Sequence, residues 1–174
     1  MSLLVFSCNP SKYTHINPDE VTFKTDEASK LFFKNVRKNY YDLEELPEAK
    51  LEVYRFKKRL LSEEKPLLDI ALVNNWRYDE AYILIEPNAA AGVLNDLYLR
   101  WTNDQTQEQG ELRFEGGNKK AHLLFAGKVY DLLLRNCRLE LNKQEQWLPI
   151  LTDQKEKEAF RITMFDYYRL TNQL

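Results

Sequence analysis

The stretch LLDIALVNNWRYDEAYILIEPN, residues 67–88, decides the fold. Its two ends, residues 67–76 and 80–88, are rich in Leu, Ile, Val and Tyr, which fit well on a pleated and partly buried surface. The middle, NNWRYDE, contains the Asn and Asp residues that are typical of turns. Two such runs joined by a short turn predict a β-hairpin.

Three further runs outside this hairpin show the alternation of side chains that marks a half-buried strand. In AKLEVYRFKKR, residues 49–59, Leu51 and Val53 share one face, and the residues between them share the other. VLNDLYLRWT, residues 93–102, alternates in the same way, and ELRFEGG, residues 111–117, adds another strand. Because short loops join consecutive strands, we expect one antiparallel, meandering sheet of about five strands.

Helical segments flank the strands. Residues 25–42 have acidic residues at their start, basic residues near their end and Thr25 as the expected N-cap. Residues 119–136 have an apolar stripe at helical spacing, and Asn118 precedes them as an N-cap. A third helix is expected over residues 154–173, although alternating apolar residues there leave a strand open as the alternative.

These elements predict an α+β domain over residues 21–174, with an N-terminal helix and two C-terminal helices packed against the sheet. VTFK, residues 21–24, is a short strand candidate, and QWLPIL, residues 146–151, is expected to be extended. Residues 1–20 are interpreted as the remnant of a signal followed by a tether.

Composition excludes several classes of protein. The 174 residues carry a net charge of −2 with both signs well mixed, so we expect no nucleic-acid partner. No run approaches the roughly 18 apolar residues of a membrane span. The two cysteines, Cys8 and Cys137, lie far apart in the sequence, and Cys137 is expected to be a free buried thiol.

The sequence lacks the motifs of common catalytic and metal sites. The two histidines, His15 and His122, have no G-x-S-x-G nucleophile to serve, and His122 is expected to be neutral near a helix start. There is no C-x-x-C, H-E-x-x-H or EF-hand loop, so we expect no metal, no cofactor and no catalytic residue. GGN, residues 116–118, is interpreted as a tight turn that leads into an N-cap.

An aromatic and cationic cluster is the best candidate for ligand binding. If residues 80–88 pair with residues 93–102, tyrosines and an Arg–Glu pair from both strands come together on one face of the sheet. Such a strip could bind a peptide, a glycan or a flat ligand through stacking and cation–π contacts. The predicted binding residues are Trp76, Arg77, Tyr82, Glu86, Tyr98 and Arg100.

The first residues of the sequence bear on where in the cell the protein is located. V-F-S-C, residues 5–8, resembles the lipobox of bacterial lipoproteins, with Val5 as the aliphatic residue, Ser7 as the small residue and Cys8 in the lipidated position. No Lys or Arg precedes Cys8 and the apolar run is short, as in a signal that has lost its beginning. The alternative is that residues 3–7 form an edge strand of a cytosolic protein.

Three functional hypotheses follow. The first is a non-enzymatic binding or assembly module of the bacterial cell envelope, anchored to the membrane through lipid on Cys8 and meeting an envelope protein, peptide or glycan. The second is a cytoplasmic α+β domain that binds a small ligand or a peptide through the strip. The third is a hydrolase that uses Glu86 and Asp96 as a carboxylate pair.

Overall fold

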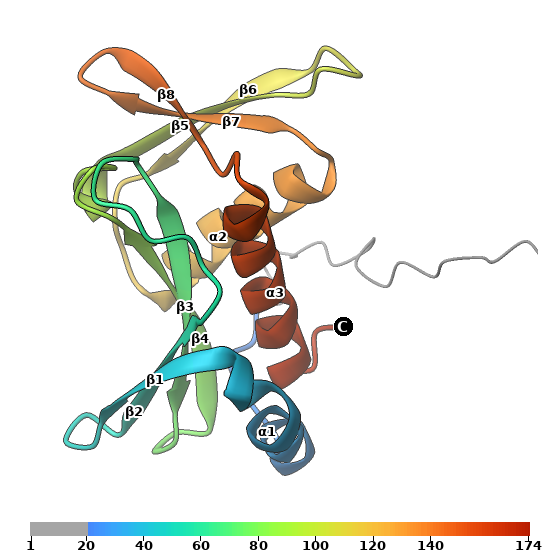
Figure 1. Ribbon diagram of the computed structural model, residues 1–174. Helices are drawn as coiled ribbons and strands as arrows, with labels where there is room; N and C mark the ends of the chain where they lie inside the picture. Colours follow the sequence, from blue (N-terminus) through green and yellow to red (C-terminus); the bar gives the residue numbers. More distant parts are fainter. Residues whose placement is uncertain (1–20) are drawn as a thin grey trace, which may run out of the picture.

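The computed structural model describes residues 21–174, which form two four-stranded antiparallel sheets and three α-helices (Figure 1). Sheet A has the order β1-β2-β3-β4, so each strand pairs with its neighbour in the sequence. Sheet B has the order β6-β5-β7-β8. The α+β class is confirmed. The single sheet of about five strands is wrong, because the chain divides its strands between two sheets.

Sheet A contains the predicted hairpin, in which Leu68 lies opposite Pro87 and Asn75 lies opposite Glu80. The helix-facing side of this sheet is part of the main core, and Leu72 there is fully buried. Its opposite side, which we call the outer face, has a small apolar cluster of its own. The strands are β1 (Tyr41–Leu46), β2 (Leu51–Phe56), β3 (Leu68–Asn75) and β4 (Glu80–Pro87).

Sheet B is built around β5, which pairs antiparallel with both β6 and β7. Leu97 and Leu99 of β5 are buried on the side that faces the helices, whereas Tyr98 and Arg100 lie on its outer face. The short 3₁₀ turn η4 (Leu94–Asp96) leads into this sheet. Its strands are β5 (Leu97–Thr102), β6 (Gln109–Phe114), β7 (Arg138–Lys143) and β8 (Gln146–Ile150).

The predicted N-terminal helix is divided into three types of turn. It begins as α1 (Glu27–Phe32), continues as the π-helix η2 (Phe33–Arg37) and ends as the 3₁₀ turn η3 (Lys38–Tyr40). The predicted cap Thr25 is wrong. Asp26 is the N-cap, because its carboxylate accepts the backbone N–H of Ser29 at 2.7 Å, while the Ser29 side chain bonds back to it.

α3 (Gln154–Leu170) runs along sheet A, and α2 (Lys119–Leu134) packs against one strand of each sheet, β4 and β6 (Figure 1). Asn118 caps α2, as predicted, and the preceding Gly116 and Gly117 have positive φ angles that glycine adopts without strain. Asp153 caps α3, so the third helix is confirmed and the alternative strand is wrong. Cys137, just after α2, is a free and buried thiol, as predicted.

The core lies where α2 and α3 meet the helix-facing sides of the strands. α2 packs against β4 and β6, and α3 packs against β2, β3, β4, α2 and the α1–η2 segment. Aromatic side chains fill much of this core: Tyr130, Phe160, Tyr167 and Tyr168 each expose 1% of their surface or less. The contacts with α3 therefore hold the α1–η2 segment in place.

Candidate functional site

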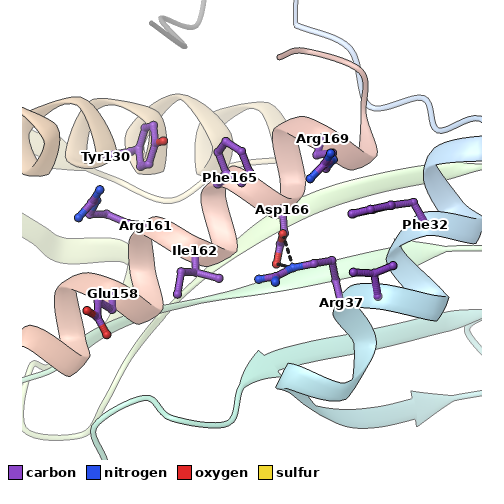
Figure 2. A pocket seen from close by; sticks show the side chains of 10 residues that line it. Phe32, Arg37, Tyr130, Glu158, Arg161, Ile162, Phe165, Asp166 and Arg169 are labelled. Atoms are coloured by element: carbon purple, nitrogen blue, oxygen red, sulfur yellow. Dashed lines mark hydrogen bonds and ion pairs between the residues drawn. The ribbon is translucent and has the colours of Figure 1, made fainter. Parts of the chain in front are cut away.

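A groove of about 630 Å³ lies between the α1–η2 segment, α2 and α3, and Figure 2 shows the side chains that line it. This volume is in the range of sites that hold small organic molecules. One wall comes from α1 and η2, the floor from α3 and the far end from α2. The lining side chains are Phe32, Val36, Arg37, Tyr130, Glu158, Arg161, Ile162, Phe165, Asp166 and Arg169.

The centre of the groove is apolar. Ile162 and Phe165 lie three residues apart on α3 and therefore on one side of that helix. Phe32 and Val36 face them from α1 and η2, and Val36 is 47% exposed although it is a large apolar side chain. An apolar surface of this kind is stabilised when a ligand removes it from water.

An ion pair with a buried carboxylate joins η2 to α3 beneath this surface. The Arg37 Nε donates to the Asp166 carboxylate at 2.8 and 3.0 Å, and the Tyr41 hydroxyl donates to Asp166 Oδ2 at 2.6 Å. The Asp166 side chain is 1% exposed, and burial raises its pKa, against the lowering effect of the bonds from Tyr41 and Arg37. Asp166 and Arg37 therefore satisfy each other and hold the wall in place.

Two other arginines of the groove form no such ion pair with a described residue. Arg161 and Arg169 have no hydrogen bond or ion pair with any residue that the structure describes. The Arg169 guanidinium lies 4.1 Å from the centre of the Phe32 ring, and Arg161 Nε is buried without a partner. They lie eight residues apart on α3, about 12 Å along the helix axis. Figure 2 shows Phe165 between them.

Tyr130 adds a buried polar atom at the α2 end of the groove. Within the described part of the chain its hydroxyl has no hydrogen-bond partner, although the residue is only 1% exposed. Burial raises its pKa, so the hydroxyl keeps its proton and can donate. A buried hydroxyl without a partner is costly, and a ligand oxygen would remove that cost.

The predicted strip is not formed as one surface, because its strands belong to different sheets. β4 pairs with β3, whereas β5 pairs with β6 and β7, so the expected pairing of residues 80–88 with 93–102 is wrong. Tyr82 and Glu86 lie on the outer face of sheet A. Trp76 and Arg77 lie in the β3–β4 turn, where Trp76 is 50% exposed.

Tyr98 and Arg100 do lie together, on the outer face of sheet B. Sequence reasoning missed their partners. The Trp147 ring lies 5.1 Å from that of Tyr98, and the Arg100 guanidinium lies 4.5 Å from Trp147. Arg113 stacks on Tyr98 at 4.0 Å, and Glu140 accepts two bonds from Arg100. These contacts satisfy both arginines, so this cluster stabilises the sheet.

The two carboxylates of the hydrolase hypothesis lie on β4 and on η4, which pack against each other. Asp96 lies in η4, and Glu86 accepts two hydrogen bonds from Arg55, each at 2.7 Å. The carboxylate opposite Glu86 in the register is Asp69, which sequence reasoning did not single out. Burial, with a contribution from the Glu86 charge, raises the pKa of Asp69 to about 6.

The raised pKa of Asp69 predicts that the stability of the folded protein depends on pH. The folded protein holds this proton more tightly than the unfolded chain between about pH 4 and pH 6, so its stability falls as the pH rises through that range. Asp69→Asn should therefore raise the free energy of unfolding by about 1 to 2 kcal/mol at pH 7.5, because one pKa unit corresponds to about 1.4 kcal/mol and partial exposure reduces the effect. At about pH 4 the gain should vanish.

Urea unfolding at the two pH values checks this, with Glu63→Gln in the exposed β2–β3 loop as a control that changes the net charge equally. A gain for Asp69→Asn that is the same at both pH values would show that the Asp69 carboxyl does not titrate abnormally.

The remaining observations concern metals, membranes and relatives. No group of His, Cys, Asp and Glu side chains among residues 21–174 is arranged to hold a metal ion. None of the helices in the same range is long and apolar enough to cross a membrane. Cys8 and the V-F-S-C segment lie outside the described residues, so lipidation stays a prediction. Comparisons with protein-family models, curated proteins and solved structures find no match.

Proposed function

We propose that the protein is a non-enzymatic binding module whose helical groove holds an elongated anionic amphiphile, such as a long-chain carboxylate. The observation that carries this proposal is a pair of guanidinium groups, Arg161 and Arg169, at either end of an apolar floor, neither of which has a hydrogen bond or ion pair with a described residue. A hydrocarbon chain would lie on Ile162 and Phe165, and an anionic group would pair with an arginine.

The charge of the groove favours an anion over a cation. Its lining has three arginines and two carboxylates, and one arginine is already paired with Asp166. Of the two that remain, Arg169 also acts electrostatically on Asp166, and neither forms an ion pair with a carboxylate among the described residues. Arginine is suited to this task because its planar guanidinium binds a carboxylate or phosphate with two parallel hydrogen bonds.

The π-helix η2 contributes to the shape of the groove. Its wider turn buries Phe33 in the core, while Val36 and Arg37 line the groove. Single π-helical turns are uncommon and occur frequently at functional sites. Location in the cell envelope stays a separate prediction, since it depends on V-F-S-C and not on the groove.

The proposal predicts charge-selective binding of anilinonaphthalene sulfonate, an apolar anion that fluoresces in apolar surroundings. Dodecanoate should displace it, whereas dodecyltrimethylammonium, which has the same chain length and the opposite charge, should not. The double variant Arg161→Gln/Arg169→Gln should weaken binding by about tenfold or more, because a hydrogen bond to a charged group contributes about 1.5 to 3 kcal/mol.

Arg138→Gln is the matched control, because Arg138 is an exposed arginine of β7 that does not line the groove. Its affinity for the probe should equal that of the unaltered protein. Equal displacement by the two detergents, or equal affinity in the double variant, would refute the proposal.

A further inference from the structure

The two sheets have four edge strands, and three of them are protected from pairing with another chain. An unprotected edge is a template for strand addition. On β4, the Ala81 N–H donates to the Phe23 carbonyl at 2.8 Å, and the Ile85 N–H donates to Nδ1 of His122 at 3.1 Å. Burial lowers the pKa of His122, which keeps Nδ1 free to accept. The edge of β4 is thus occupied.

The edges of β1 and β8 are protected by their composition. β1 has three acidic residues, Asp42, Glu44 and Glu45, and no basic one, so a second copy of this strand would be repelled. β8 contains Pro149, which has no N–H to donate to a neighbouring strand. Both are ordinary ways in which proteins prevent association through sheet edges.

The edge of β6 has neither kind of protection (Figure 1). In the hairpin that joins β5 to β6, the Asn103 N–H donates to the Glu108 carbonyl at 2.8 Å. This bond fixes which β6 residues direct their backbone groups toward β5 and which direct them outward. In an antiparallel ladder every second pair is bonded in this way, so Leu112 bonds to β5 while Glu111 and Arg113 direct their backbone groups outward. These outward groups have no hydrogen bond with any described residue.

A groove of about 440 Å³ runs beside this edge, between β6 and α2. Leu112 from β6 and Leu124 from α2 line it, and both are only partly buried. Lys128 of α2 lies at its rim. A strand added to β6 could therefore bond to the free backbone groups along the edge and cover the partly buried Leu112 and Leu124 of the groove beside it.

We propose that β6 pairs antiparallel with β6 of a second copy of this chain, about a two-fold axis at Leu112. The outward backbone groups of one copy can bond only to the outward groups of the other copy, so only a few registers of the two strands are possible. With the axis at Leu112, Glu111 lies opposite the partner's Arg113, and Arg113 lies opposite the partner's Glu111. Moving the axis by one residue in either direction would place Glu opposite Glu or Arg opposite Arg.

The same register would also cover Leu112, which is only partly buried and lines the groove beside β6. Residues opposite each other in an antiparallel pair point to the same face of the sheet. Leu112 and the partner's Leu112 would therefore both point to the α2 side and lie together beside the groove. The strands of the two copies would form one continuous sheet, with both α2 helices on the same side of it.

Sedimentation equilibrium over about 10 to 500 µM protein tests this proposal, since that range brackets micromolar affinities. We expect a reversible dimer. Arg113→Glu should raise the dissociation constant about tenfold or more, because it places two like-charged pairs across the axis. Glu111→Arg/Arg113→Glu should restore the affinity to within about threefold of the original, because it reverses both pairs.

The design separates pairing from loss of local contacts. Arg113 stacks on Tyr98, and both variants lose that contact, so only charge pairing across the axis explains a recovery in the double variant. Arg138→Glu, which alters an arginine of the same sheet away from the edge, should dimerise normally. A monomer at every concentration, or a dimer that tolerates Arg113→Glu, would overturn the proposal. A monomer that binds an added extended peptide would assign the edge to another chain.

Discussion

Replacing Asp166 with alanine is expected to lower the free energy of unfolding by about 3 to 5 kcal/mol, which is typical when one member of a buried ion pair is removed. Asp166 accepts hydrogen bonds from Arg37 and from the Tyr41 hydroxyl, and its side chain is 1% exposed. Its loss would leave a guanidinium and a buried hydroxyl without their acceptor. The effect should exceed that of any surface charge in the protein.

Urea unfolding of a double-mutant cycle measures this directly. Arg37→Ala alone and Asp166→Ala alone should each be destabilising, and the double variant should lose clearly less than their sum, because the two groups share one interaction. Glu158→Ala, which removes an exposed carboxylate from the same helix, should change stability by no more than about 0.5 kcal/mol. Strictly additive losses would mean that the Arg37–Asp166 pair contributes nothing specific.

Replacing Phe33 with alanine should cost about 3 to 5 kcal/mol, the usual penalty for emptying a buried phenylalanine site. Phe33 is 4% exposed, and its ring lies 5.1 Å from the ring of Tyr54 and 5.7 Å from that of Tyr41. These contacts hold η2 against sheet A. Their loss should also weaken binding of anilinonaphthalene sulfonate, since η2 forms a wall of the groove.

Val36→Ala provides the contrast, because Val36 lies on the same π-helical turn but is exposed. It should cost less than about 1 kcal/mol and should reduce binding of the probe only through lost apolar contact. Thermal unfolding and probe fluorescence, measured on both variants, distinguish the two effects. Equal stabilities for Phe33→Ala and Val36→Ala would show that the aromatic contacts do not anchor η2.

The elements that the sequence predicted well are those whose signals are local. The hairpin over residues 67–88 combines two strand-forming runs with a polar turn, and the structure pairs them as expected. α2 and its cap Asn118 follow from helical spacing and from the geometry of an N-terminus. At the first helix, Thr25 and Asp26 are both suitable caps, and the reach of the Asp26 carboxylate to Ser29 decides between them.

The strands that were missed have weak local signals. YDLEEL, which forms β1, is acidic, and its first two residues continue the helical pattern of residues 25–42, so no local signal indicates a strand. RLELNK, which forms β7, is short and follows α2 without a Gly or Pro to separate them. Each is identified as a strand by its partners, β2 for β1 and β5 with β8 for β7. The division into two sheets depends on the same nonlocal pairing.

The groove could not be predicted from local patterns, because its walls meet across large sequence separations. Arg37 and Asp166 are 129 residues apart, and nothing near either residue indicates the other. The local sequence signal of the groove is on α3, where Arg161, Phe165 and Arg169 recur at a spacing of four residues and therefore lie on one side of the helix. The strip hypothesis placed Tyr98 and Arg100 on one face of a strand, as in the structure, but lacked Trp147, which comes from β8.

The position of α3 in the chain order has a consequence for biosynthesis. Sheet A is complete once Pro87 has been translated, yet α3, which covers part of its helix-facing side, comes from residues 154–170. While sheet B and α2 are being synthesised, the apolar side of sheet A has no α3 to cover it on the ribosome. Nascent chains with uncovered apolar sheets aggregate readily. We therefore expect chains that end before α3 to aggregate more readily than the full chain.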